Sequence, residues 1–74
     1  MVSNGGENMN INTHRIKHHM CANLMTQLQL AEAAGVSLST INCTLLKGSC
    51  SIQTAGKIAK ALGVDPVEII EVED

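Results

Sequence analysis

Apolar residues recur along most of the chain with the period of short amphipathic helices. In the first such stretch, Ile16, Met20 and Leu24 follow one another at intervals of four residues, which places them on one face of a helix. Thr13 precedes this stretch and is a candidate N-cap residue. We therefore predict a first helix over residues 14–24.

Two more helices are predicted directly after it. Thr26 and Gln29 form a T-x-x-Q capping box, in which the hydroxyl and the amide each bond a backbone N–H group of the first turn. The second helix starts at this box and stops at Gly35, where a left-handed backbone has little cost for a residue without a Cβ atom. Ser37 is the candidate N-cap of a third helix over residues 38–46.

The last third of the chain predicts two further helices. Ser51 is the candidate N-cap of a fourth helix, which ends at Gly63. Asp65 followed by proline predicts the start of a fifth helix, with Asp as N-cap and Pro at the first helical position. The segment VEIIEVE at the end of this helix also fits an extended strand.

These elements predict one all-α domain over residues 13–70, a compact bundle of about five short helices. Residues 1–12 are polar and aperiodic, which indicates a flexible N-terminal arm, and residues 71–74 form an acidic tail. The chain contains no Phe, Tyr or Trp, so its core must consist of aliphatic side chains and Met, which suits packed helices.

Composition also bears on compartment and partners. No apolar run approaches the roughly 20 residues of a membrane span, and no leader resembles a signal peptide. The three cysteines form no C-x-x-C motif, which favours reduced thiols in a cytoplasmic protein. Residues 1–48 are weakly basic and residues 49–74 are acidic, so we expect a polyanion to bind residues 1–48.

The second and third predicted helices are separated only by the residues GVS around a glycine, which is the helix-turn-helix arrangement. The outward positions of the third helix carry small polar side chains and no carboxylate, so this helix can approach a groove lined with phosphates. Ser and Thr can bond base edges, and Asn42 can make a bidentate bond with adenine.

The stretch LMTQLQLAEAAGVSLSTIN, followed by KIAKALGVDPVEII, resembles the Cro/lambda-repressor family of helix-turn-helix regulators, often called the Xre family. The family pattern runs T-Q-x-x-L-A-x-x-x-G-V-S-x-x-x-I-S, and the resemblance covers about residues 11–70. It implies a lambda-repressor-like DNA-binding domain. The stretch that follows Ile41 is one residue longer than in the family, which should lengthen the third helix or reshape the next loop.

The resemblance also implies roles for particular residues. The positions of the third helix that face the bases are Leu38, Ser39, Thr40, Asn42 and Cys43. The positions expected at the DNA backbone are Arg15, Lys17, Gln27 and Lys47, and the N-cap Ser37 is a further phosphate contact.

We therefore expect a transcriptional regulator of the repressor type, from a phage, a mobile element or a bacterial chromosome, which binds a double-stranded DNA operator as a homodimer. The alternative is an antitoxin, or another protein-interaction module built on a helix-turn-helix domain, with a toxin as its partner. We expect no enzymatic activity and no cofactor, because no carboxylate pair, nucleophile–base motif or phosphate-binding glycine loop is present.

Three potential zinc ligands share one face of the first helix. His14, His18 and Cys21 are spaced by four and three residues, and zinc accepts both residue types. No fourth ligand is evident nearby, so we expect no metal site. The histidines, His19 included, are expected to be solvent-exposed or near phosphates, where their protonation would strengthen DNA binding at lower pH.

Overall fold

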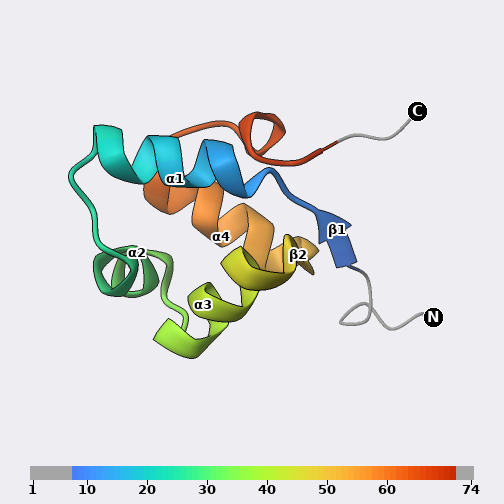
Figure 1. The fold of residues 1–74 in the computed structure, drawn as a ribbon, viewed down its shortest axis with the longest axis horizontal. Helices are drawn as coiled ribbons and strands as arrows, with labels where there is room; N and C mark the ends of the chain where they lie inside the picture. The colour runs from blue at the N-terminus through green and yellow to red at the C-terminus, as the bar shows by residue number, and fades with distance from the viewer. Residues whose placement is uncertain (1–7, 72–74) are drawn as a thin grey trace.

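The computed structural model describes residues 8–71 and shows helices packed around a common centre, with two short strands at one end (Figure 1). The elements in chain order are β1 (Asn8–Asn10), α1 (Thr13–Ala22), α2 (Gln27–Ala34), α3 (Leu38–Lys47), β2 (Ser49–Ser51), α4 (Ile52–Leu62) and the 3₁₀ turn η2 (Pro66–Glu68). The prediction of a mostly helical helix-turn-helix domain is confirmed, with four α-helices among the described residues.

The N-caps predicted for α2, α3 and α4 are all present. In α2, the Thr26 hydroxyl accepts the Gln29 N–H at 3.1 Å, and the Gln29 side chain accepts the Thr26 N–H at 2.9 Å. Ser37 caps α3 and Ser51 caps α4, each by accepting the backbone N–H of the residue three positions later. The prediction for α1 was wrong by one residue, because Asn12, which has extended backbone angles, accepts the N–H three residues later.

The helix ends follow the glycines, with one exception. The three glycines that follow α2, α3 and α4 all have φ of 74°. Helix α1, however, ends at Ala22, and Leu24 adopts a left-handed φ of 56°. Leu24 was predicted on the buried stripe of α1, but its side chain is 88% exposed because the chain has already left the helix.

The prediction of a flexible arm was wrong for residues 8–12. Strand β1 pairs antiparallel with β2, with Met9 opposite Cys50. The next residue, Ile11, is buried and forms an isolated bridge with Ile70. Residues 1–7, the other part of the predicted arm, lie outside the described residues.

The predicted fifth helix is reduced to the single turn η2. Asp65 caps this turn and Pro66 is its first residue, as predicted. After the turn the chain is held by hydrogen bonds to the N-terminal segment, in which Asn12 N–H donates to Ile69 at 2.7 Å and Glu71 N–H donates to Asn10 at 2.9 Å. This pairing replaces further helical turns. Residues 72–74 of the predicted tail lie outside the described residues.

The core joins all parts of the described chain. Its largest fully buried side chains are Ile16, Leu30, Ile41, Ile58 and Ile69, which come from α1, α2, α3, α4 and the C-terminal segment. The burial of one isoleucine or leucine from each element fixes the rotation of the helices about their axes. None of the helices among residues 8–71 is long and apolar enough to cross a membrane.

Candidate nucleic-acid interface

Helices α2 and α3 are joined by a turn that the local sequence specifies. Gly35 adopts the left-handed conformation, so its N–H and that of Val36 turn back to the last carbonyls of α2, at 3.3 and 3.0 Å. Val36 packs against the core, and Ser37 caps the next helix. The turn therefore fixes the direction in which α3 leaves α2.

Burial decides which face α3 presents to solvent. Ile41 and Thr44 are buried, and Leu45 packs against the core. Of the seven remaining positions, Thr40 is partly buried and the other six form two stripes with a spacing of four residues, Ser39–Cys43–Lys47 and Leu38–Asn42–Leu46. All six of these side chains are exposed.

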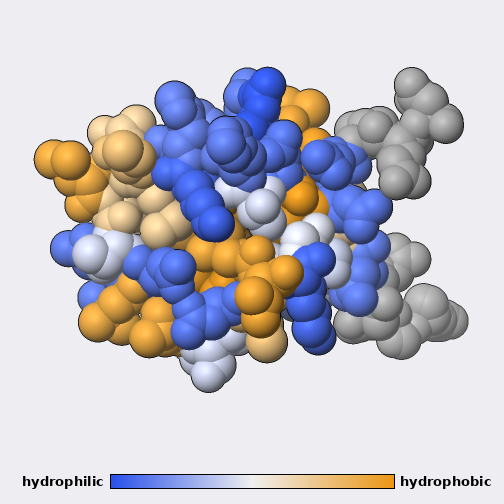
Figure 2. All heavy atoms as spheres, in the orientation of Figure 1, coloured by the Kyte–Doolittle hydropathy of each residue, from blue (hydrophilic) through white to orange (hydrophobic). Residues whose placement is uncertain are grey.

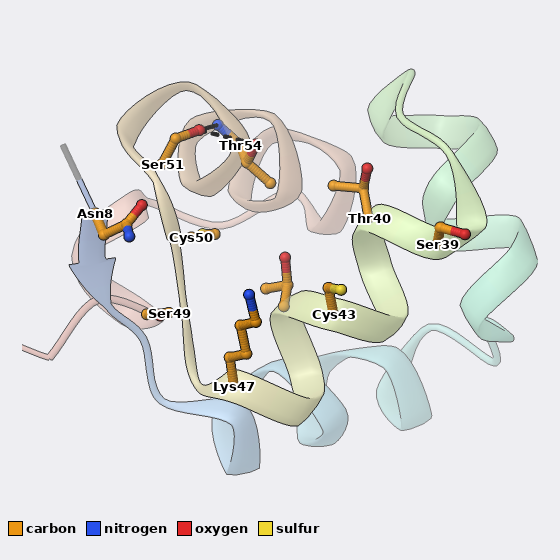
Figure 3. A pocket seen from close by; sticks show the side chains of 10 residues that line it. Asn8, Ser39, Thr40, Cys43, Lys47, Ser49, Cys50, Ser51 and Thr54 are labelled. Atoms are coloured by element: carbon orange, nitrogen blue, oxygen red, sulfur yellow. Dashed lines mark hydrogen bonds between the residues drawn. The ribbon is translucent and has the colours of Figure 1, made fainter. Parts of the chain in front are cut away.

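The two stripes have different surroundings. The stripe that contains Cys43 borders a hollow of about 330 Å³ between α3, the two strands and the start of α4 (Figure 3). The residues that line this hollow are Asn8, Ser39, Thr40, Cys43, Thr44, Lys47, Ser49, Cys50, Ser51 and Thr54. The stripe that contains Asn42 borders no part of the hollow.

The hollow has a simple electrostatic character. Among the described residues that line it, Lys47 is the one with a charge, and Figure 3 shows its side chain extending from α3 into the space between α3 and β2. No carboxylate of residues 8–71 lines the hollow. Burial raises the pKa of the Cys50 thiol above its ordinary value, so this side chain is a neutral part of the wall.

Some of the lining hydroxyls already have partners. The Thr40 hydroxyl lies 2.9 Å from the hydroxyl of Ser37, and the Ser51 hydroxyl donates to Thr54 at 3.0 Å. Ser37 and Ser51 also hold the first turns of their helices by accepting a backbone N–H. These four hydroxyls therefore help to fix the helix starts.

The residues predicted at the DNA backbone are not all brought together. Gln27 is exposed at the first position of α2, beside the free N–H groups of that helix. Arg15 forms an ion pair with Glu68 of η2, with 3.0 Å between the charged atoms. In Figure 1, η2 and α3 lie on opposite sides of α1, so the pair lies on the flank away from α3.

The histidines lie on the same flank as this ion pair. His14, His18 and His19 line a second hollow, of about 310 Å³, together with Arg15 and Glu68. Cys21 is not among the residues that line it. Within residues 8–71 no group of three His, Cys, Asp or Glu side chains is arranged to hold a metal ion.

Several residues of the α3 surface were not singled out from the sequence. Asn8 and Ser49 reach the hollow through the pairing of β1 with β2, and neither strand shows a periodic pattern along the sequence. The sequence pattern predicts no role for Thr54 and only a capping role for Ser51. Leu46, which is 88% exposed, could have been found from its spacing of four residues after Asn42.

Solved structures of much larger proteins contain a segment with a similar fold. Three structures are similar: cadmium-bound native PhpD, PhpD with cadmium and hydroethylphosphonate, and a mutant of hydroxyethylphosphonate dioxygenase. Their TM-scores are 0.70, 0.70 and 0.71, at 29%, 29% and 28% sequence identity. Each match covers 88% of this chain but only 14% of the other.

A search among curated proteins gave no match. The family model of the Cro/C1-type HTH DNA-binding domain, in contrast, matches residues 15–74, which include the whole of α2, the turn and α3. The geometry agrees with this match, because α2 and α3 are joined by a tight glycine turn and α3 keeps an exposed face. The chain belongs to the family of Cro/C1-type helix-turn-helix DNA-binding domains.

Proposed function

We propose that this DNA-binding regulator reads an operator with α3 in the major groove and acts as a repressor. The observation that carries the proposal is the exposed surface of α3 and of the neighbouring hollow, which is polar apart from Leu38 and Leu46, contains Lys47 and, among residues 8–71, contains no carboxylate. A surface without carboxylates can approach phosphates without repulsion, and its small side chains let the helix backbone come close to the bases.

In this proposal, the residues of α3 have separate roles. Asn42 bonds adenine through N6 and N7, whereas Leu38 contacts a thymine methyl group. Ser39 and Cys43 face the bases from the other stripe, with Thr40 beside them. Hydroxyls and thiols offer fewer hydrogen bonds than an amide, so Asn42 carries most of the sequence discrimination.

The backbone contacts come from the periphery of α3. Gln27 and the free N–H groups at the start of α2 bind one phosphate, and Ser37 and Lys47 bind others at the two ends of α3. Lys17 of α1 is exposed and remains a candidate. Arg15 is left out, because Glu68 already binds it on the flank away from α3.

We further propose a homodimer on a palindromic operator, in which each subunit places one α3 in successive major grooves. Such a regulator works in the cytoplasm, without enzymatic activity and without a cofactor. Selection from a random DNA pool at low salt tests the operator directly. Enrichment of a two-fold symmetric site would support the proposal, and a pool that stays random would contradict it.

The role of Asn42 is tested on the selected site. Asn42→Ala should cost about 1–3 kcal/mol of binding free energy and relax preference at one base pair per half-site. Gln27→Ala should weaken all sequences equally, because a phosphate contact does not read sequence. Circular dichroism controls for folding of both variants. Unchanged affinity and selectivity in Asn42→Ala would show that this stripe does not face the bases.

One observation favours the alternative of a protein-interaction module. Leu38 and Leu46 are 40% and 88% exposed on the stripe that also contains Asn42, and Figure 2 shows apolar atoms gathered over the C-terminal half of α3. An antitoxin could bury these leucines against its toxin. Coexpression with the product of an adjacent toxin-like reading frame, for wild type and Leu46→Ser, separates the two functions, because operator binding should survive this substitution and toxin binding should not.

A further inference from the structure

Thr44 combines deep burial with an unused hydroxyl. The residue is only 3% exposed, yet its side chain makes no hydrogen bond within the described part of the chain. No fully buried polar atom of residues 8–71 lacks a partner, so the Thr44 hydroxyl must keep some access to solvent. Because Thr44 lines the hollow beside α3, this access is through the hollow.

Other polar groups of the same hollow are also uncommitted. The side chains of Asn8, Ser39 and Ser49 line it without a hydrogen bond to any described residue, and so does the Lys47 ammonium group. Hydroxyls and amides both donate and accept hydrogen bonds. The described part of the chain therefore presents several neutral hydrogen-bonding groups and one cation to the hollow.

The start of α4 adds positive potential on the opposite rim. The helix has 11 residues, and its first turn contains no acidic side chain. Ser51 takes the N–H of Thr54, which leaves the N–H groups of Ile52 and Gln53 without a helical acceptor. Lys47 and this helix start thus favour an anionic group between them.

The volume of the hollow and the residue types available in the chain limit the class of ligand that could bind there. A volume of about 330 Å³ exceeds that of a single phosphate group and leaves room for a short carbon skeleton. The chain contains no Phe, Tyr or Trp on which a nucleobase could stack, and its three histidines do not line this hollow. The uncommitted hydroxyls and the Asn8 amide instead match the hydroxyl groups of a polyol.

We infer that this hollow binds a small phosphorylated polyol of the sugar-phosphate class. The phosphate lies between Lys47 and the start of α4, and Thr44 bonds the ligand from the floor. A consequence that rests on the proposed function is competition with DNA, since Ser39 and Cys43 belong to both surfaces. A DNA backbone phosphate presents the same anionic chemistry, so the test must separate the two sources.

The first arm uses the full chain without DNA. Glucose 6-phosphate, inorganic phosphate and glucose are titrated into the ¹⁵N-labelled protein, and backbone amide shifts are followed by NMR. We expect saturable shifts at Thr44, Ile52 and Gln53 with glucose 6-phosphate, weaker ones with phosphate, and none with glucose. Absence of saturable shifts with glucose 6-phosphate, or equal affinity for phosphate alone, would overturn the inference.

Variants locate the site. Thr44→Val keeps the shape of the side chain and removes its hydroxyl, and should weaken glucose 6-phosphate binding about tenfold. Lys47→Gln is exposed, leaves the core intact and should weaken binding at least as much. Lys60→Gln, a lysine that does not line the hollow, is the control for nonspecific charge effects. Equal affinity of Thr44→Val and wild type would overturn the inference.

The second arm adds the selected operator duplex. If glucose 6-phosphate binds and raises the apparent Kd for the duplex in wild type but not in Thr44→Val, both the site and its overlap with DNA are supported. If it binds without competing, the hollow remains a ligand site and the DNA-facing role of α3 is contradicted instead. If only the duplex shifts these amides, the phosphate source is DNA and the inference is overturned.

Discussion

Leu24 is the one residue of the described chain that combines a left-handed backbone with a bulky side chain. The three glycines that end the other helices adopt the same region without cost, whereas a Cβ atom there meets the following carbonyl oxygen. Its side chain is 88% exposed, so burial does not repay this strain. Leu24 therefore weakens the connection between α1 and α2.

The first prediction follows from this conformation. Leu24→Gly should raise the free energy of unfolding by about 0.5–1 kcal/mol, because the relieved strain exceeds the extra entropy of glycine in the unfolded chain. Urea denaturation measures the change. Leu46→Gly is the matched control, since Leu46 is equally exposed but helical, and it should destabilise by about 1 kcal/mol. A loss of stability in Leu24→Gly would show that Leu24 makes contacts that compensate its backbone.

A second prediction at this scale concerns Cys50, whose thiol pKa is raised by burial. The unfolded thiol ionises at lower pH than the folded one, so this group leaves stability unchanged well below its ordinary pKa. Stability should then fall as pH rises through the ordinary pKa toward the raised one. Unfolding midpoints in urea from pH 7 upward, compared with those of Cys50→Ala, measure this dependence.

The rate of alkylation independently tests the burial of the Cys50 thiol. Iodoacetamide should label the exposed Cys21 and Cys43 well before Cys50, as peptide mass spectrometry can follow. Fast labelling of Cys50 in the folded protein would mean that β2 opens readily or that the thiol is not buried.

At the scale of elements, the helices depend on caps formed within their own first turns. The box of Thr26 and Gln29 satisfies two N–H groups that no helical carbonyl can reach. It lies next to Gln27, the residue proposed at the DNA backbone, so the cap also fixes part of the candidate interface. The capping box of α2 therefore supports both the helix and the position of Gln27 in the candidate interface.

Thr26→Ala should lower the free energy of unfolding by about 1 kcal/mol, because it removes the side-chain acceptor of the capping box. Gln27→Ala should change stability by no more than about 0.5 kcal/mol, since its exposed side chain makes no hydrogen bond among the described residues. Thermal and urea unfolding of both variants test the contrast. Equal losses would mean that Gln27 supports the fold as well as the proposed DNA contact.

At the scale of the whole molecule, the C-terminal segment affects the surface charge as well as the core, because its Glu68 pairs with Arg15. Arg15 is one of the three cationic residues predicted to contact DNA. Its ion pair with Glu68 lies on the flank away from α3. Because both side chains are about half exposed, the pair adds little stability. Its larger effect is to reduce the positive charge available to phosphates.

The salt dependence of DNA binding should reflect this loss. With Lys17 and Lys47 as the remaining cations, the slope of log K against log salt should be about −2 per subunit. Lys47→Gln should reduce the slope by about 1, whereas Arg15→Gln should leave it unchanged. Fluorescence anisotropy across a salt series measures it. A much steeper slope, or a loss in Arg15→Gln, would return Arg15 to the interface.

The same geometry revises the expectation for the histidines. His14, His18 and His19 line the hollow that also contains Glu68 of η2, so a proton gained there adds charge beside η2, which lies across α1 from α3. A strengthening of DNA binding at lower pH through these residues is therefore no longer expected.

The helix-turn-helix and most helix boundaries could be predicted from the sequence, because the interactions that set them are local. A cap joins residues three positions apart, and a left-handed glycine needs only its own backbone. The apolar stripes of α2, α3 and α4 follow from a period of 3.6 residues in the same way. The choice between Asn12 and Thr13 as the cap of α1 was the exception, since both residue types can serve.

Only the tertiary structure decided the features that join distant parts of the chain. The pairing of residues 8–12 with β2 and with Ile69–Glu71, the replacement of a fifth helix by η2 and the ion pair of Arg15 all depend on contacts between residues about 40 to 60 positions apart. The hollow beside α3 arises from the same pairing, which brings Asn8 and Ser49 opposite Lys47. The periodicity of apolar residues does not predict such contacts, because strand pairing depends on the partner strand and on burial and not on either segment alone.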